Sequence, residues 1–405
     1  MILGGKKILI CQSFIYQING STMVTLELAE TLKKICDVTV YTTIFDSPAK
    51  EIFEEKGIKV VSFDDNPIIK LEDFDFIWIH SQILPKSLIN DMRRIGKIKN
   101  APKFIFLHMS PLENCSDERP WIYDLENKLA DKVLCISDEI KEVIEPYVDN
   151  EICFFRNPCP EAYINRNRTY KKLERVLIVS NHWVEEVIDA KNLLETKYNI
   201  EVKILGESGI YEAISPELIN QFDAVITIGK TVPMCLLAGI PVYIYDHFGG
   251  DGYLNKDNYI SNKQTNFSGR NNRLSKTGEI IAKEIIEGYE DAIEFISKNS
   301  EDFIEEFSLS KNLDRLFSNI EQHKKQNFDE EYIRYILTSQ DLARHNIYYG
   351  SYEAYREKRK NKEILEECAR LKKQSKELYD EVEGIKNSRT YKFAKKLSSI
   401  FKRKK

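Results

Sequence analysis

The segment with the clearest chemical potential begins at Gly229, where an apolar run ends and Lys230 and Thr231 follow. A helix is predicted to begin there, and a helix N-terminus offers unpaired backbone N–H groups and a favourable dipole to an anion. Lys230 adds a full positive charge and Thr231 adds a hydroxyl group. This combination predicts binding of a diphosphate.

The next apolar run leads into a predicted loop over residues 248–252, with three glycines in four positions. Such glycines allow a backbone to approach a ligand closely, or they serve only the positive φ angles of a tight connection. Because this loop and the loop at Lys230 follow neighbouring strands of one α/β unit, we favour a ligand site. Its further candidate residues are Asp246, His247, Gly249, Gly250 and Asp251.

Two histidines end consecutive strand candidates: His80 closes the run FIWIH, and His108 closes FIFLH. The C-terminal ends of strands line the crevice of an open α/β sheet. A histidine there can contact a sugar hydroxyl or a developing charge at neutral pH, although it can also be a hydrogen-bonded structural residue. We take His108 as the catalytic candidate and His80 as a substrate-binding one.

Small residues follow other predicted strands. Gly20 and Ser21 begin a helix after the first strand, where Gly20 can lie close to a phosphate or an acceptor. The GxGxxG fingerprint of dinucleotide binding is absent, and Gly-Ser-Thr is also an ordinary capping sequence. Asn181 and Gly206, at the ends of two strands in the second half, complete the candidate set.

A regular series of strands in the first half must position these residues. Most are continuous runs of Ile, Val and Phe, as expected of strands buried on both faces of a parallel sheet. Amphipathic segments such as Ser21–Ile35 separate them, and Ser137 is predicted to cap another helix. The alternation predicts a doubly wound α/β domain. The strands are predicted at Lys7–Cys11, Val38–Thr42, Ile58–Ser62, Phe76–His80, Lys103–His108, Lys132–Ile136 and Glu151–Phe154.

A polar stretch, Asn157–Lys172, interrupts the series, which then restarts. We expect an N-terminal Rossmann-like domain over residues 1–160 and a C-terminal one over 170–300, with their strand edges facing a shared cleft. The later strands are predicted at Arg175–Ser180, Glu201–Gly206, Ala224–Gly229 and Pro241–Tyr245, and the helices at Trp183–Thr196, Ser215–Phe222 and Lys230–Ala238.

The remaining chain is predicted to be a helical extension: residues 301–362 pack back on the core, and 363–405 form a heptad-like helix with a basic tail. Between Ile364 and Ile385 the seam positions alternate steps of four and three, with Cys368 and Ser375 as weak members. This pattern fits either a coiled coil that would make a homo-oligomer or a helix packed on its own domain.

The tail over residues 388–405 contains eight lysines or arginines and no acidic residue. Phe393, Leu397, Ile400 and Phe401 fall on one side at helical spacing. A basic amphipathic helix predicts attachment to an anionic membrane surface, and a solvated terminus is the alternative.

The bulk composition excludes several classes of protein. A net charge of -5 over 405 residues gives no reason to expect a nucleic-acid partner. Eight cysteines without a CxxC pair predict neither a disulfide framework nor a zinc site. The sequence has no signal-peptide pattern and no apolar run of bilayer length, so we expect a cytoplasmic protein, peripheral on the inner face of the membrane through its tail.

Several of these segments resemble the GT-B glycosyltransferases, specifically the family-4-like group (glycosyltransferase group 1). ADKVLCISDEIKEVI is similar to the end of the N-terminal domain in that group, and FRNPCPE is similar to the connection that follows. VSNHWVEE and GKTVPMCLLAGIPVYIYDHFGGDGYL resemble a bacterial cell-surface polysaccharide subgroup. The resemblance covers roughly residues 5–320 and is most specific over 229–254.

This resemblance implies a GT-B fold with a sugar nucleotide between the two domains, its phosphates on the C-terminal one and the acceptor on the N-terminal one. It also implies that no metal and no cofactor besides the nucleotide sugar is needed, because helix N-termini and basic side chains stabilise the leaving diphosphate. Lys230 matches the basic residue after the glycine, and His108 matches the cleft histidine. The chain departs from the family at Met234 and Ile226, where relatives commonly carry a pair of glutamates that contact the donor.

The function expected is transfer of a sugar from a nucleotide-sugar donor to a lipid-linked cell-surface glycan acceptor at the cytoplasmic membrane face. Two alternatives stay open. A sugar-nucleotide epimerase on the same fold would need acid/base residues facing the donor sugar and no lipid acceptor. A catalytically degenerate scaffold that acts through its C-terminal helix is favoured by Met234.

Overall fold

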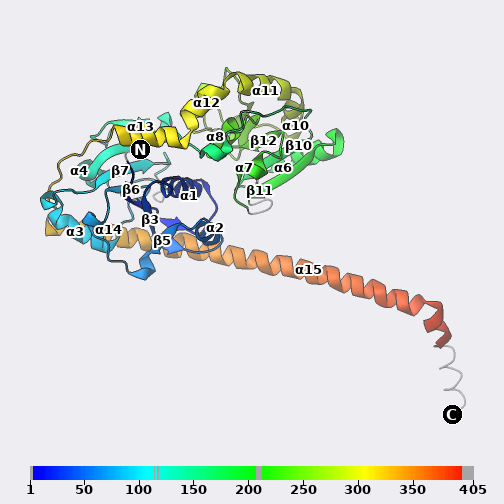
Figure 1. Cartoon of the computed structure of the whole chain (residues 1–405). Helices are drawn as coiled ribbons and strands as arrows, with labels where there is room; N and C mark the ends of the chain where they lie inside the picture. The colour runs from blue at the N-terminus through cyan, green and yellow to red at the C-terminus, as the bar shows by residue number, and fades with distance from the viewer. Residues whose placement is uncertain (1–2, 114, 116–117, 207–211, 395–405) are drawn as a thin grey trace, which may run out of the picture. The chain divides into compact units, whose positions relative to one another are not determined.

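The computed structural model describes residues 3–113, 115, 118–206 and 212–394. The chain divides into two compact units, residues 1–344 and 345–405. The first unit contains two α/β sheets with their covering helices (Figure 1). The second contains a π-helical segment, Asn346–Tyr352, and the long helix α15 (Glu353–Asn387).

The first sheet has seven parallel strands in the order β5-β3-β1-β6-β7-β8-β9. The order reverses between β1 and β6, so this pair flanks the switch point at which open α/β sheets bind ligands. All seven predicted strands are confirmed within two residues, since long apolar runs are a dependable signal of buried strands. They are β1 (Lys7–Cys11), β3 (Asp37–Thr42), β5 (Lys59–Ser62), β6 (Phe76–Ile79), β7 (Lys103–His108), β8 (Ala130–Cys135) and β9 (Ile152–Phe154).

Helices cover this sheet and begin where polar side chains cap them. The side chain of Asn19 accepts a hydrogen bond from the backbone of Thr22 at the start of α1, and Ser137 caps α5 in the same way, as predicted. A short pair of strands, β2 (Phe14–Ile15) and β4 (Ile44–Phe45), was not predicted. The helices are α1 (Gly20–Leu32), α2 (Ala49–Glu55), α3 (Lys86–Asp91), α4 (Tyr123–Leu129) and α5 (Asp138–Ile144).

The second sheet has five strands in the order β11-β10-β12-β13-β14, and its switch point lies between β10 and β12. β10 to β13 are parallel, and β14 runs antiparallel to β13. The prediction of a loop over residues 248–252 is wrong, because Gly249–Tyr253 is the edge strand. The strands are β10 (Arg175–Ser180), β11 (Glu201–Gly206), β12 (Ala224–Thr227), β13 (Val242–Asp246) and β14 (Gly249–Tyr253).

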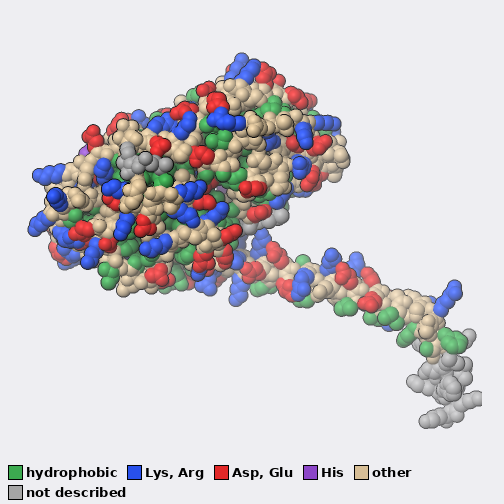
Figure 2. Space-filling model, viewed as in Figure 1, with side chains coloured by type: hydrophobic (Ala, Val, Ile, Leu, Met, Phe, Trp, Pro, Cys, Tyr) green, Lys and Arg blue, Asp and Glu red, His purple; other side chains and the backbone are tan. Residues whose placement is uncertain are grey.

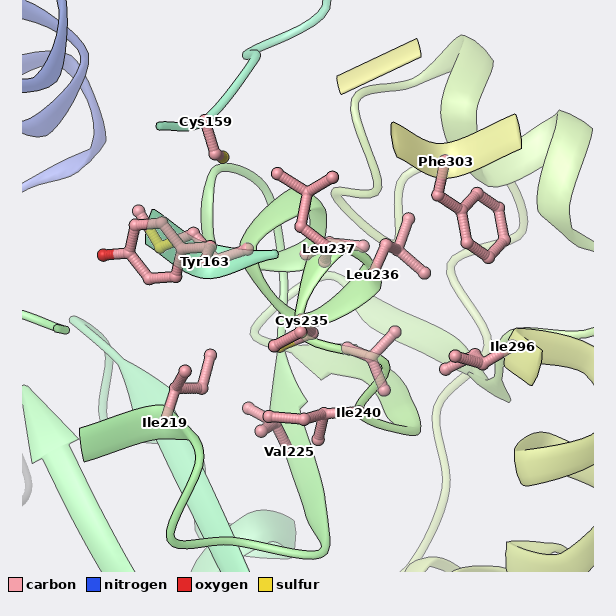
Figure 3. Packing of buried hydrophobic residues seen from close by; sticks show 14 of the residues in the cluster. Cys159, Tyr163, Ile219, Val225, Cys235, Leu236, Leu237, Ile240, Ile296 and Phe303 are labelled. Atoms are coloured by element: carbon pink, nitrogen blue, oxygen red, sulfur yellow. The ribbon is translucent and has the colours of Figure 1, made fainter. Parts of the chain in front are cut away.

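Two apolar clusters fill the faces of the second sheet. Alternate residues of β12 belong to different clusters, Val225 to one and Ile226 to the other, as the pleat of a strand requires. In the first cluster the helix α8 (Thr231–Leu237) contributes Leu236 and Leu237, which lie near Phe303 of α12 (Figure 3). Each fully buried side chain of this size contributes about 1.5–3 kcal/mol. The other helices of this half are α6 (Glu185–Tyr198), α7 (Pro216–Ile219), α9 (Tyr259–Gln264), α10 (Gly278–Glu287), α11 (Tyr289–Lys298), α12 (Ser300–Phe307) and α13 (Leu309–Ser318).

After α13 the chain returns to the first sheet. Lys325 forms a buried ion pair of 2.5 Å with Asp131 of β8. Farther on, in α14 (Glu330–His345), Gln340 accepts a hydrogen bond from the backbone of Leu84, and Arg344 donates one to the carbonyl of Leu84. The returning segment therefore belongs to the packing of the first sheet, although it follows the second in sequence.

The fold class predicted from the sequence, two doubly wound α/β domains with a C-terminal helical extension, is confirmed. Within the described residues, no helix combines the length and the apolar character needed to cross a bilayer. Residues 395–405 of the predicted basic tail lie outside the described residues.

Candidate functional site

The switch points of the two sheets meet around the start of α1. A Cβ atom added to Gly20 would lie 3.8 Å from Cβ of Lys230, which follows β12. Asn181, which follows β10, approaches the carbonyl oxygen of Ile18 with its side-chain nitrogen at 3.5 Å. The structure therefore brings Gly20, Asn181 and Lys230 together, as a site between two such sheets requires.

Lys230 is the most constrained of these residues. Its Nζ lies 2.7 Å from a carboxylate oxygen of Glu27 in α1, and its side chain is only 7% exposed. The same ammonium donates to the carbonyl of Pro158 at 2.8 Å and contacts Sγ of Cys159 at 3.2 Å. Burial disfavours the charge of Lys230, but Cys159 and Glu27 outweigh it and raise the pKa of the ammonium.

Glu27 had no place among the predicted site residues. Burial raises the pKa of its carboxyl, and the neighbouring Lys230 opposes that effect. Removing one member of a buried ion pair typically costs 3–5 kcal/mol, because the other charge is left uncompensated. The Glu27–Lys230 pair is thus a structural link between the two sheets as well as a candidate site.

Further polar contacts join the first sheet and the connection between the sheets to residues 266–270. Arg270 reaches Glu139 at the start of α5 through two hydrogen bonds, of 3.1 and 2.6 Å. Asn157, in the connection between the sheets, donates to the side chain of Asn266 at 2.9 Å. A two-point Arg–carboxylate contact fixes geometry better than a single charge pair does.

Asp246, at the end of β13, gathers two imidazoles. Its Oδ1 lies 3.1 Å from Nδ1 of His182 and 3.0 Å from Nδ1 of His247, and Oδ2 accepts from Ser180 at 2.7 Å. Burial would raise the pKa of this carboxyl, but hydrogen bonds from His182, the backbone of His247 and Ser180 outweigh it and lower the pKa. Asp246 is therefore an ionised acceptor that orients both rings.

The two imidazole rings and the ring of Phe248 form a row of tilted aromatic contacts that leads toward Arg270. The centroids of His182 and His247 are 3.7 Å apart, and those of His247 and Phe248 are 3.9 Å apart. The guanidinium of Arg270 lies 5.4 Å from the Phe248 ring. This row offers aromatic faces and imidazole nitrogens beyond the ends of β10 and β13, the two strands that flank β12.

The same three residues could also hold a metal ion. One potential ligand atom from each of His182, Asp246 and His247 lies within 4.8 Å of the others, in the part of the chain that the structure describes. Two imidazole nitrogens and a carboxylate oxygen are a donor set that Zn²⁺ accepts. In the described conformation Asp246 is hydrogen-bonded to both imidazole rings.

The predicted glycines have a structural explanation. A Cβ on Gly250 would lie 1.9 Å from the carbonyl oxygen of Ile244, and a Cβ on Gly249 would lie 2.3 Å from that of Leu274. Asp251 accepts hydrogen bonds from three asparagine side chains, at 2.7–2.8 Å. These residues hold β14 against its neighbours. They lie next to the Asp246 cluster and support it.

His80 lies at the switch point of the first sheet but is fully buried. Its Nδ1 lies 2.9 Å from Oγ1 of Thr25 in α1. Burial lowers the pKa of the imidazole to about 3, so the ring is neutral at physiological pH. His80 thus joins the end of β6 to the helix that carries Glu27.

His108 is also fully buried, between two side chains of α4. Its Nε2 contacts both carboxylate oxygens of Glu126, at 3.0 and 3.2 Å, and its ring stacks on Tyr123. Nδ1 has no hydrogen-bond partner among the residues that the structure describes. No atom of the ring reaches the surface in this conformation, and its catalytic role stays a prediction.

Met234 and Ile226 both belong to the apolar cores, each 1% exposed. A side chain at either place points into the packing of the sheet. The positions where relatives carry glutamates are therefore filled by apolar core side chains in this chain, and the hypothesis of a degenerate scaffold stays open.

The remaining candidates lie at the same edges. Ser21 donates to the side chain of the capping Asn19 at 3.1 Å, and Thr231 is 8% exposed in the first turn of α8. Gly206 ends β11 with φ 105°, and a Cβ there would lie 1.9 Å from the carbonyl oxygen of Ser180. Only glycine fits that close approach.

No protein-family model matches the chain, and no curated protein sequence matches it. Similar solved structures include HepE from Anabaena in complex with UDP and glucose, with 13% identity, 77% of this chain and 98% of that chain covered, and a TM-score of 0.48. A glycosyltransferase from Rickettsia africae has 15% identity, 82% and 99% coverage, and a TM-score of 0.49. A putative UDP-N-acetylglucosamine 2-epimerase from Listeria monocytogenes has 12% identity, 80% and 100% coverage, and a TM-score of 0.45.

The first prediction concerns Gly250. Gly250→Ala should destabilise the fold by about 1–3 kcal/mol, because backbone must shift to admit the methyl group. Gly4→Ala is the matched control, since nothing in the described part of the chain lies within 4 Å of its added Cβ. Urea unfolding of both variants measures the difference, and equal stability of the two would show that β14 does not pack as described.

The second prediction concerns His80. Because the pKa of this imidazole is depressed in the folded state, its contribution is complete above pH 6.5 and is lost as pH falls toward 3. Relative to His80→Gln, the wild type should lose about 1.4 kcal/mol per pH unit once the pH is well below 6.5. Unfolding free energies measured between pH 8 and 4.5 test this, and parallel curves for the two proteins would contradict it.

Proposed function

We propose that the chain is a glycosyltransferase that takes a sugar from a nucleotide-sugar donor. The observation that supports it is the meeting of two doubly wound sheets at their switch points, with Gly20 of one beside Lys230 of the other. Ligands of open α/β sheets bind beyond the carboxyl ends of the strands at such points. Two facing sites of this kind suit a donor and an acceptor.

The donor diphosphate is proposed to bind at the second sheet. Lys230 supplies a positive charge and Thr231 a hydroxyl, while His182 and His247 present imidazole nitrogens held by Asp246. Such groups can offset the charge of a leaving diphosphate without a metal ion, because they are already oriented before the bond breaks. Gly20 and Ser21 would face the donor from the first sheet.

Lys230 can reach a phosphate only by exchanging a partner. In the described conformation the carboxylate of Glu27 compensates the charge of Lys230, with 2.7 Å between Oε2 of Glu27 and Nζ of Lys230. A phosphate oxygen would replace that carboxylate while the carbonyl of Pro158 remains at 2.8 Å. We propose that Glu27 holds the charge of Lys230 in the absence of donor and competes with it when donor binds.

The acceptor is proposed to be a lipid-linked surface glycan at the cytoplasmic face of the membrane. The support for this comes from the sequence of residues 388–405, with eight basic residues and no acidic one. Each basic residue near an anionic surface contributes about 1 kcal/mol to attachment. An enzyme with a membrane-bound acceptor gains local concentration from such a tail.

One observation favours an epimerase as the alternative function. The group of Asp246, His182 and His247 provides acid/base side chains next to the proposed diphosphate site, which epimerisation of a donor sugar would require. An epimerase would act on the nucleotide sugar alone, without any acceptor.

The third prediction tests donor binding. Thermal unfolding with UDP-, GDP- and dTDP-sugars should show a raised Tm for one nucleotide, because a ligand that binds only the folded state stabilises it. At a ligand concentration of 100 times Kd the gain is about 2.7 kcal/mol. Absence of a shift with all of them would contradict both enzymatic functions.

A second experiment separates the transferase from the epimerase. The nucleotide sugar that binds is incubated with the protein alone, and NMR of the sugar follows. An epimer formed without acceptor supports the epimerase.

The fourth prediction separates the structural and donor roles of Lys230. Lys230→Met should weaken binding of the nucleoside diphosphate at least ten-fold, whereas Glu27→Gln should tighten it, because a competing carboxylate is removed and Lys230 is kept. Both variants break the same ion pair, so each serves as the stability control for the other.

Calorimetric titration of the two variants with the nucleoside diphosphate measures these affinities, after circular dichroism has shown that both are folded. Equal weakening in the two would mean that the pair matters only for the fold. Unchanged affinity in Lys230→Met would remove Lys230 from the donor site.

A further inference from the structure

The helix α15 has an unpartnered apolar face. It runs for 35 residues, and none of its residues is buried. In the view of Figure 2, apolar side chains gather along one edge of this helix and charged ones along the opposite edge. Helices in water owe most of their stability to burial of such a face. The exposed fractions along this face are 51% for Ile364, 50% for Leu371, 61% for Leu378, 46% for Val382 and 55% for Ile385.

We propose that this face binds a second copy of the chain in a parallel, in-register, two-stranded coiled coil. The steps of four and three between Ile364 and Ile385 define a heptad in which isoleucine and leucine occupy every d position. At the centre of the seam, leucine at d (Leu371 and Leu378) with β-branched Val382 at a is the combination that favours two strands. The d positions are Ile364, Leu371, Leu378 and Ile385, and the a positions are Cys368, Ser375 and Val382.

The charges beside the seam select a parallel partner. In a parallel dimer each g residue faces the e residue that follows it on the other helix. This places Glu367 opposite Lys372 of the second copy and Glu381 opposite Lys386 of the second copy. Two-fold symmetry repeats both pairs, so four attractive contacts flank the seam.

An antiparallel pairing would reverse this balance. There the g positions face each other, and so do the e positions. In the antiparallel register that overlaps the seam most fully, Glu367 would lie opposite Glu381 of the second copy and Lys372 opposite Lys372. Like charges across a seam suppress a wrong alignment. In the single chain Glu367 contacts Arg370 on its own helix at 2.6 Å, an exposed pair that exchanges at little cost.

The weak members of the seam also fit this arrangement. Ser375 at an a position reduces stability but penalises shifted registers, as polar residues at a do in other coiled coils. Cys368 at another a position would face Cys368 of the second copy across the axis. It is the exposed cysteine of the chain, whereas the other seven are buried or partly buried.

The dimer has a consequence for the tail over residues 388–405. In a parallel pair both tails leave the coil at the same end, so sixteen basic residues rather than eight are presented together. This extends the proposed membrane attachment without depending on it, since the seam is defined by residues 364–386 alone.

The mass of the full chain in solution is the primary test. Sedimentation velocity should show a concentration-dependent change from the 47.3 kDa monomer to a species of twice that mass. A monomer at all concentrations up to 100 µM, or a species larger than a dimer, would overturn the proposal.

Charge variants test the alignment. Glu367→Lys with Glu381→Lys should weaken the dimer at least ten-fold, and adding Lys372→Glu with Lys386→Glu should restore it. Glu366→Lys with Glu377→Lys is the matched control, because it makes the same change of charge at positions f and c, away from the seam. Equal effects of the seam and control variants would overturn the assignment of the interface.

Cysteine crosslinking tests the orientation. Mild oxidation of the full chain with diamide should give a dimer on a non-reducing gel, and Cys368→Ser should abolish it. A disulfide forms only when the Cα atoms approach within about 7 Å, which the parallel register allows at this position. A dimer by mass that does not crosslink through Cys368 would overturn the parallel register.

Discussion

A buried ammonium group needs compensation, and the compensation of Lys230 connects the two sheets of the first unit. Its carboxylate partner, Glu27, comes from a helix of the first sheet, and its carbonyl partner, Pro158, comes from the connection between the sheets. An uncompensated charge in such surroundings costs several kcal/mol. This requirement fixes the end of β12, the helix α1 and the connection relative to one another. Displacing any one of them would leave a buried charge without its partner.

The strands whose burial requires apolar side chains could be predicted from the sequence. The strand β14, whose backbone packs directly against neighbouring backbone, could not. β1, β7 and β10 match the predicted bounds, since each contains a continuous apolar run, and β11 matches although Glu201 and Lys203 interrupt its apolar residues. β14 has the sequence GGDGY, which carries no period of two and resembles a loop. Its glycines are required by the close approach of Ile244 and Leu274, which lie on other segments.

The sequence predicted which residues lie at the ends of strands in the site. It did not predict which side chains they contact. Glu27 lies three residues after Val24 and next to Leu28, on the face of α1 that the sequence marks as buried, so a partner could have been expected. Nothing in the sequence says that the partner is Lys230. Likewise His108 ends its strand as predicted, yet α4 covers it with Glu126, and that packing depends on tertiary structure.

The raised pKa of Glu27 bears on how the proposed exchange at Lys230 can occur. If a phosphate takes the ammonium, the carboxylate of Glu27 loses the charge that opposes its burial, and its pKa must rise further. A buried carboxyl in that position is expected to take up a proton, because the neutral acid avoids the cost of an isolated charge. Donor binding would thus be coupled to uptake of a proton at Glu27, so that the ion pair opens without leaving an uncompensated carboxylate.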